Sequence, residues 1–276
     1  MMSLYKIFSV KIILFIGQRT FFGRGKIRKM LVRLIEFIIF NSKEKLNDNR
    51  FICKILGVPF YFIFDKILDY KFYFFRSDRK EIFYLINKIE NNNIFFDIGA
   101  SMGLYTQFIA FNLKSIKNSK IISVEPDPQN CERIRLNLSL LKNKVPNIFD
   151  IVKIENCALG DKNCNLFLNK NLGPANAMLI DKFIPGSIKV NVKKLADIIH
   201  SNKINNITSL KIDVEGYEDK ILLPFFKNFS RNLFPKNIII ENVRNILWNV
   251  NIIDYMLSIG YKKIYENKAN TILRII

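Results

Sequence analysis

The sequence predicts an α/β fold, in which a mainly parallel sheet carries helices on both faces, preceded by a basic N-terminal extension. Two observations support this prediction. From residue 93 onward, short apolar runs alternate with longer polar stretches of helical character, which is typical of βαβ units. Before residue 79 this alternation is absent. We therefore divide the 276 residues into an extension, residues 1–78, and an α/β domain, residues 79–276.

The extension is rich in basic and apolar residues. In residues 1 to about 50, each apolar run is interrupted by Lys or Arg before the roughly 18 residues that a membrane-spanning helix needs. No small-residue cleavage site follows the first run, so a signal peptide is not expected. These residues predict helices that either pack on the α/β domain or lie on an anionic membrane. Residues 51–78 alternate and carry aromatic side chains, which predicts a short β-hairpin.

The α/β domain begins with a helix. Ile82, Leu85, Ile86 and Ile89 recur at helical spacing and predict a helix over residues 79–92. Five apolar runs then predict parallel strands, and two amphipathic stretches predict helices. The strands are expected at residues 94–98, 120–125, 150–156, 209–214 and 237–242, and the helices at 130–141 and 252–260. Two last segments, 261–267 and 270–276, predict a hairpin at the sheet edge with an antiparallel final strand.

The composition limits the classes of partner. A net charge of +19 favours an anionic partner such as nucleic acid, phospholipid or an acidic glycan, although a lysine-rich surface alone has the same composition. The sequence contains neither zinc-finger spacing nor the aromatic signature of RNA-binding modules. Its four Cys residues form no CxxC pair, and its only His, His200, excludes mechanisms that need two histidines. We expect a cytoplasmic protein, either free or peripheral at the inner membrane face.

A glycine-bearing turn follows the first predicted strand. Asp97 ends the strand, Gly99, Ser101 and Gly103 lie in the turn, and a helix begins near Gly103. Ligands bind beyond the carboxyl ends of parallel strands, and Gly leaves space that a side chain would take from the ligand. The dinucleotide fingerprint GxGxxG is absent, because Ser101 stands at its second Gly. The turn therefore favours a nucleoside ligand without a pyrophosphate.

Polar residues end the second and third predicted strands. Glu125 stands where one carboxylate can accept both ribose hydroxyls; the alternative is that it only caps the following helix. Asp127 is the expected N-cap of that helix. Asn156, Ala158 and Leu159 are candidates to line an adenine slot after the third strand, and an ordinary strand-to-loop turn is the alternative.

Three acids are predicted at the carboxyl edge of the sheet. Asp213 and Glu215 follow the fourth apolar run, and Glu241 ends the fifth. Burying such carboxylates without a partner is costly. An acid whose pKa is raised by burial and by neighbouring acids can accept the proton of a hydroxyl group. The alternatives are that Asp213 and Glu241 hold Mg²⁺, or that the acids pair with Lys211 or Arg244 and have only a structural role.

In order and spacing, four segments resemble the FkbM-type family of S-adenosylmethionine-dependent methyltransferases: DIGASMG, EPDPQN, CALGD and LKIDVEGYED. The resemblance covers roughly residues 90–245. It implies a class I methyltransferase sheet of seven strands with an antiparallel last strand, and S-adenosylmethionine as the cofactor. Two departures are Ser101, where the family usually has Asn, and Ala196, where it usually has an acid. In this frame the predicted cofactor-binding residues are Asp97, Gly99, Ser101, Gly103, Glu125, Asn156, Ala158 and Asp213, and the predicted catalytic residues are Asp213, Glu215 and Glu241.

The resemblance favours methyl transfer to a hydroxyl of a sugar, glycan or small-molecule acceptor. The high positive charge favours an alternative, an RNA methyltransferase, although no aromatic Pro-Pro-Tyr-like run follows the fourth strand. Ala196 favours a second alternative, a module that binds the cofactor without catalysis. We also expect the Gly-, Pro- and Asn-rich segment 171–187, including Asn176, to form a substrate-facing loop.

Overall fold

The structure is a computed structural model that describes residues 50–63, 78–113, 118–171 and 177–276. The chain divides into two compact units, Met1–Arg79 and Lys80–Ile276. In the first unit, β1 (Arg50–Ile55) and β2 (Val58–Ile63) form an antiparallel hairpin around Leu56 and Gly57. A hairpin was predicted over residues 51–78, and the remainder of that range, 64–77, lies outside the described residues. The helices predicted before residue 50 lie outside the described residues.

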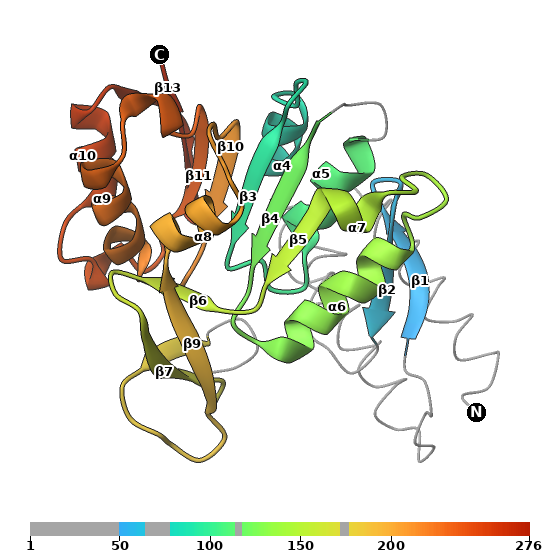
Figure 1. Ribbon diagram of the computed structural model, residues 1–276, viewed down its shortest axis with the longest axis horizontal. Helices are drawn as coiled ribbons and strands as arrows, with labels where there is room; N and C mark the ends of the chain where they lie inside the picture. Colours follow the sequence, from blue (N-terminus) through green and yellow to red (C-terminus); the bar gives the residue numbers. More distant parts are fainter. Residues whose placement is uncertain (1–49, 64–77, 114–117, 172–176) are drawn as a thin grey trace. The chain divides into compact units, whose positions relative to one another are not determined.

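A seven-stranded sheet forms the second unit and confirms the predicted fold class (Figure 1). Its strand order is β12-β13-β11-β10-β3-β4-β5. Six strands run in one direction, and β13 lies antiparallel between β11 and β12. The last strand is thus inserted next to the edge, while β12 forms the edge itself. The strands are β3 (Ile94–Ile98), β4 (Lys120–Val124), β5 (Val152–Glu155), β10 (Ser209–Ile212), β11 (Asn237–Glu241), β12 (Tyr261–Glu266) and β13 (Asn270–Ile275).

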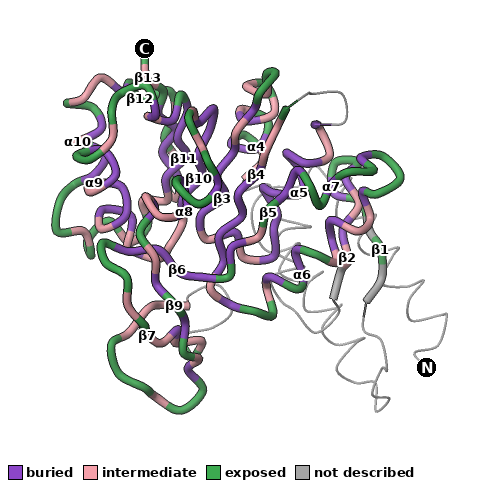
Figure 2. The backbone as a smooth tube through the Cα atoms, viewed as in Figure 1, coloured by how far each residue is buried: buried purple, intermediate pink, exposed green. Residues whose placement is uncertain are grey.

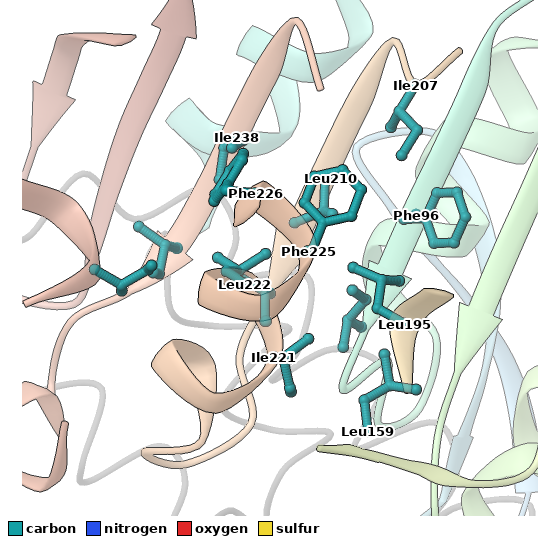
Figure 3. Packing of buried hydrophobic residues seen from close by; sticks show 14 of the residues in the cluster. Phe96, Leu159, Leu195, Ile207, Leu210, Ile221, Leu222, Phe225, Phe226 and Ile238 are labelled. Carbon is teal, nitrogen blue, oxygen red and sulfur yellow. The ribbon is translucent and has the colours of Figure 1, made fainter. Parts of the chain in front are cut away.

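Helices cover both faces of this sheet. On one face, α8, α9 and α10 enclose the larger core, where Phe225 and Phe226 of α9 lie over Leu210 and Ile238 (Figure 3). On the other face, α5 packs against the residues of β3 that alternate with that core, since Asp97 bonds to Thr106. The helices are α4 (Arg79–Ile86), α5 (Leu104–Asn112), α6 (Pro128–Ser139), α7 (Ile148–Ile151), α8 (Leu195–Ser201), α9 (Glu218–Asn228) and α10 (Ile252–Ser258).

Several predicted boundaries shift for local reasons. Helix α6 begins at Pro128, two residues before the predicted start, because the Asp127 side chain accepts a hydrogen bond from the backbone N–H of Gln129 at 3.0 Å. Strand β5 begins at Val152 because the residues before it form the helical turn α7. Strand β10 ends at Ile212, so its predicted extension through 214 is wrong. The chain leaves the strand before Asp213.

A smaller sheet, which we call the accessory sheet, extends from the carboxyl edge of the main sheet (Figure 1). Its strand order is β6-β9-β7-β8, and it has a small core of four buried residues, Ala158, Leu168, Val190 and Val192. Strand β8 lies inside the segment 171–187 that was predicted to be a loop, and Asn176 lies outside the described residues. The strands are β6 (Ala158–Gly160), β7 (Cys164–Asn169), β8 (Met178–Ile180) and β9 (Ile188–Lys194).

Burial follows this architecture. The inner strands of the main sheet are buried, whereas its edge strand β12 is mostly exposed and the accessory strands β7 and β8 are only partly buried (Figure 2). His200 is exposed near the end of α8. Within the described ranges, no helix combines the length and the apolar character that crossing a bilayer requires.

Candidate active site

The glycine turn after β3 lies against the end of β10. Gly99, Ser101 and Gly103 have left-handed backbones, with φ of 72°, 51° and 81°. A Cβ on Gly99 would lie 1.9 Å from the carbonyl oxygen of Asp213, and a Cβ on Gly103 would lie 2.9 Å from Ile134. This corrects the expectation that a side chain would take ligand space, because it would first collide with the protein. Glycine is required here for the close contact of two site segments.

Asp97 is fully buried beneath this turn. Its Oδ2 accepts hydrogen bonds from the backbone N–H of Thr106 at 2.9 Å and from the Thr106 hydroxyl at 2.7 Å. Its Oδ1 is buried without a hydrogen-bond partner, and burial raises the pKa of the Asp97 carboxyl. The side chain thus anchors the first turn of α5 to β3. Direct contact of Asp97 with a cofactor stays a prediction.

Glu125 joins the turns that follow β3 and β4. Its Oε2 accepts the backbone N–H of Ser101 at 2.7 Å, and its Oε1 accepts the backbone N–H of Asp127 at 3.0 Å and the amide of Asn130 at 3.2 Å. The side chain therefore braces the start of α6, which was the alternative role. Oε2 accepts one hydrogen bond here, and a carboxylate oxygen has the capacity to accept a second. Burial raises the pKa of the Glu125 carboxyl.

The other predicted adenosine contacts lie in different surroundings. The Asn156 amide donates to the carbonyl oxygens of Glu125 and Pro126, both at 3.0 Å. Ala158 is buried in the core of the accessory sheet and Leu159 in the main core. Asn156 thus supports the turn after β4. Contacts of these three side chains with adenine stay predictions.

The three predicted acids come together at the carboxyl edge. Asp213, Glu215 and Glu241 each offer a carboxylate oxygen within 4.8 Å of the others. Strand alternation does not bring them together, since β10 ends at Ile212. Instead Glu215 and Gly216 have left-handed backbones, with φ of 58° and 100°, and turn the chain back at the sheet edge. The acids therefore cluster through a turn that the sequence signals only by one Gly.

Two of these acids have cationic partners. Lys211 Nζ lies 3.4 Å from Asp213 Oδ2 and 3.2 Å from the carbonyl oxygen of Gly99, while Arg244 pairs with Glu215. Glu241 differs, because its Oε2 is buried without a hydrogen-bond partner. Burial and the charges of Asp213 and Glu215 raise the pKa of Glu241 to about 8. Glu241 therefore titrates close to neutral pH, and its deprotonated form can accept a proton.

Sequence reasoning missed two buried acids at the start of α9. Glu218 accepts hydrogen bonds from the backbone N–H of Val214 at 2.9 Å and from the indole N–H of Trp248 at 2.7 Å. Asp219 accepts the backbone N–H of Asn249 at 2.8 Å. Together they fix the segment that follows β11, which we call the 242–250 loop. Adjacent acids at a helix start were a visible signal, but they also suit the helix dipole alone.

Comparison with known proteins decides the family. Residues 97–263 match the family described as the methyltransferase FkbM domain. The chain belongs to this family. A search of curated proteins found no match.

Solved structures with a similar fold include three methyltransferases. One is the FkbM methyltransferase from Methylobacillus flagellatus, with 17% identity, a TM-score of 0.46, and coverage of 75% of this chain and 54% of that one. An rRNA methylase from Streptococcus thermophilus has 11% identity, a TM-score of 0.43, and coverage of 73% and 97%. The M. jannaschii tRNA m1G37 methyltransferase has 13% identity, a TM-score of 0.44, and coverage of 91% and 69%. The chain thus spans about half the length of the first of these.

The two departures from the FkbM pattern have definite positions. Ser101 adopts a left-handed backbone, a conformation that Asn tolerates better, and donates its N–H to Glu125. Ala196 lies in the first turn of α8 beside Asp197, which accepts a hydrogen bond from Asn163 at 2.7 Å. The remaining acid thus supports the junction with the accessory sheet. A loss of activity through Ala196 stays a prediction.

The site of this FkbM domain fits S-adenosylmethionine in its donor set. Glu125 Oε2 has capacity for a ribose hydroxyl, and the backbone of the glycine turn is free of side chains at positions 99 and 103. The unpartnered buried Oε2 of Glu241 adds acceptor capacity at the edge where the methyl group would be transferred. When bound, the cofactor supplies an activated methyl group on a cationic sulfonium.

Proposed function

We propose that this chain is an S-adenosylmethionine-dependent O-methyltransferase that acts on a hydroxyl of a sugar, glycan or small molecule. Family membership supports the methyl transfer. The single observation that favours a hydroxyl acceptor is Glu241, a buried acid with an unpartnered oxygen and a pKa of about 8. A hydroxyl must lose its proton during transfer, and a base titrating near the working pH serves this best.

The residues at the carboxyl edge of the main sheet have different roles in the proposed reaction. Glu125 and the glycine turn hold the nucleoside part of the cofactor, and Asp213 faces its methionine end. Glu241 accepts the proton of the acceptor hydroxyl as the new C–O bond forms and the C–S bond breaks. Arg244 fixes Glu215, which orients the acceptor. Most of the rate gain comes from holding the oxygen and the methyl carbon in line.

A Mg²⁺-assisted reaction uses the same three acids. Their carboxylate oxygens lie within 4.8 Å of one another, and hard cations prefer such ligands. Against this, Glu241 with a pKa of about 8 is mostly protonated near pH 7, so a metal would have to displace that proton. The same proton must leave before Glu241 can accept another, so both roles need the deprotonated carboxylate, and the effect of EDTA separates them.

The first experiment is calorimetric titration of S-adenosylhomocysteine into the wild type, Glu125→Ala and Glu132→Ala, with and without EDTA. Glu132 is an exposed acid of α6 and gives the matched control. We expect micromolar binding to the wild type and to Glu132→Ala, and loss of binding in Glu125→Ala. Sensitivity to EDTA would support the metal-assisted reaction. A folded wild type that binds no S-adenosylhomocysteine would refute the proposal.

The acceptor class is tested next by transfer of a radiolabelled methyl group. Hydroxyl-bearing sugars and glycans are compared with total RNA, because the net charge of +19 supports RNA as the second candidate. We expect label on the hydroxyl acceptors, and little with Glu241→Gln. Label only on RNA would favour the RNA methyltransferase. Cofactor binding without transfer to any acceptor would favour the inactive module.

A further inference from the structure

The 242–250 loop exposes an unusual number of aliphatic side chains. The exposed fractions are 57% for Val243, 89% for Ile246, 46% for Leu247 and 39% for Val250. Single exposed apolar residues are normal on protein surfaces. Four large ones within nine consecutive residues form a patch of the kind that marks an interaction surface.

Hydrogen bonds hold this loop in place. Glu218 binds the indole of Trp248, Asp219 binds the backbone of Asn249, and Glu215 pairs with Arg244. At the other end, the Asn242 backbone N–H donates to the Ala269 carbonyl at 2.8 Å. Because both ends and the middle are fixed, the aliphatic side chains stay outside the core. Their exposure is a property of the folded site.

The loop also borders the catalytic acids. A Cβ on Gly216 would lie 2.7 Å from the Leu247 side chain, so Leu247 packs against the residue that follows Glu215. Whatever covers the exposed side chains therefore lies beside the acceptor site.

The one charged residue within the loop is cationic, and the acids that contact the loop are engaged: Glu215 pairs with Arg244, and Glu218 and Asp219 accept hydrogen bonds from the loop. Neither the loop nor the turn Asn267–Asn270, to which it is hydrogen-bonded, contains an acidic residue. They contribute Arg244, which is paired with Glu215, and Lys268, which is exposed. The whole chain carries +19. Exposed aliphatic side chains on a strongly cationic protein match the two components of an anionic bilayer surface, its acyl chains and its headgroups.

We propose that the 242–250 loop docks on an anionic lipid bilayer, with Ile246 and Val243 among the upper acyl-chain segments. Docking places the acids of the site at headgroup level, where they meet the hydroxyl of a lipid-linked acceptor. The docking itself is independent of methyl transfer, and only the choice of a lipid-linked acceptor rests on the proposed function.

The fluorescence of Trp248 can report the docking of the loop on a bilayer, because Trp248 is the only Trp of the chain and lies within the loop. Full-length protein is mixed with vesicles of phosphatidylcholine and phosphatidylglycerol at 3:1, with brominated or unmodified acyl chains, and Trp emission is recorded. We expect stronger quenching by the brominated chains. Ile246→Asn should weaken vesicle binding about tenfold, because it replaces an aliphatic side chain that the bilayer would bury with a polar amide.

Phe183→Asn is the matched control, since Phe183 is 63% exposed and lies between β8 and β9, outside the loop. It should bind vesicles like the wild type. Both variants should bind S-adenosylhomocysteine normally, which separates failed docking from a failed cofactor site. Two results would overturn the proposal: vesicle binding without bromine quenching and unaffected by Ile246→Asn, or a dimer that Ile246→Asn converts to a monomer in sedimentation. The second result would assign the patch to another copy of the chain.

Discussion

Gly99→Ala tests how closely the glycine turn approaches the end of β10. A left-handed backbone costs Ala about 1–2 kcal/mol, and Gly99 has φ of 72°. The new Cβ would also lie 1.9 Å from the carbonyl oxygen and 2.9 Å from the carbonyl carbon of Asp213. Both are backbone atoms, so a segment must shift, which adds about 1–3 kcal/mol. The shift disturbs the contact of Lys211 with the Gly99 carbonyl. We expect a total loss of about 2–5 kcal/mol.

Gly260→Ala is the control for the backbone cost alone. Gly260 has φ of 102°, and its Cβ would meet the end of the Arg231 side chain, which can move. It precedes β12, which is separated from β3 and its glycine turn by β13, β11 and β10. Denaturation followed by Trp248 emission should show a loss of about 1–2 kcal/mol. S-adenosylhomocysteine affinity should fall at least about tenfold in Gly99→Ala, if the shift costs the complex 1.4 kcal/mol, and stay unchanged in Gly260→Ala. If Gly99→Ala and Gly260→Ala lost the same stability and bound S-adenosylhomocysteine with the same affinity, the close contact of Gly99 with Asp213 would be refuted.

Three further predictions concern buried polar groups. In Glu241→Gln, the rise of kcat with pH towards about 8 should disappear, and kcat should fall about 10²–10⁴-fold. Because the pKa of Glu241 is raised above its ordinary 4.5, wild-type stability should decrease from about pH 5 to 8; urea unfolding of Glu241→Gln should show a flatter profile. In a double-mutant cycle, Glu218→Gln and Trp248→Phe should each lose about 1–3 kcal/mol and be non-additive, whereas additive losses would contradict their bond. Thr106→Val should lower the unfolding midpoint by removing a bond to Asp97, and an unchanged midpoint would contradict this.

The main sheet could be predicted because its signals are local. Each apolar run ends in a polar residue or Gly, and the Asp127 cap is a local contact. The accessory sheet gave no such signal, since β6 and β8 have three residues each. Strands this short show no period and exist through their neighbours, as when Ala158 pairs with Val192. The structure of residues 158–194 therefore depends on long-range pairing.

The site was predictable where strand ends determine it. Asp213 follows β10 and Glu241 ends the neighbouring parallel strand β11, so their meeting at one edge follows from topology. The partners of the acids were not predictable, because Arg244 pairs with Glu215 across 29 residues and Trp248 binds Glu218 across 30. Such pairs depend on how a loop folds back, which no local pattern encodes.

The accessory sheet begins and ends at adjacent points. Its first strand, β6, pairs in parallel with its last, β9, so the chain leaves the main fold and re-enters it about one strand spacing apart. A stretch with neighbouring ends can be exchanged with little strain on its host. The segment 158–194 is therefore suited to exchange as one unit in protein engineering. Transplanting the corresponding stretch from another FkbM domain would change the accessory sheet while leaving Glu125, Asp213 and Glu241 at the ends of their original strands.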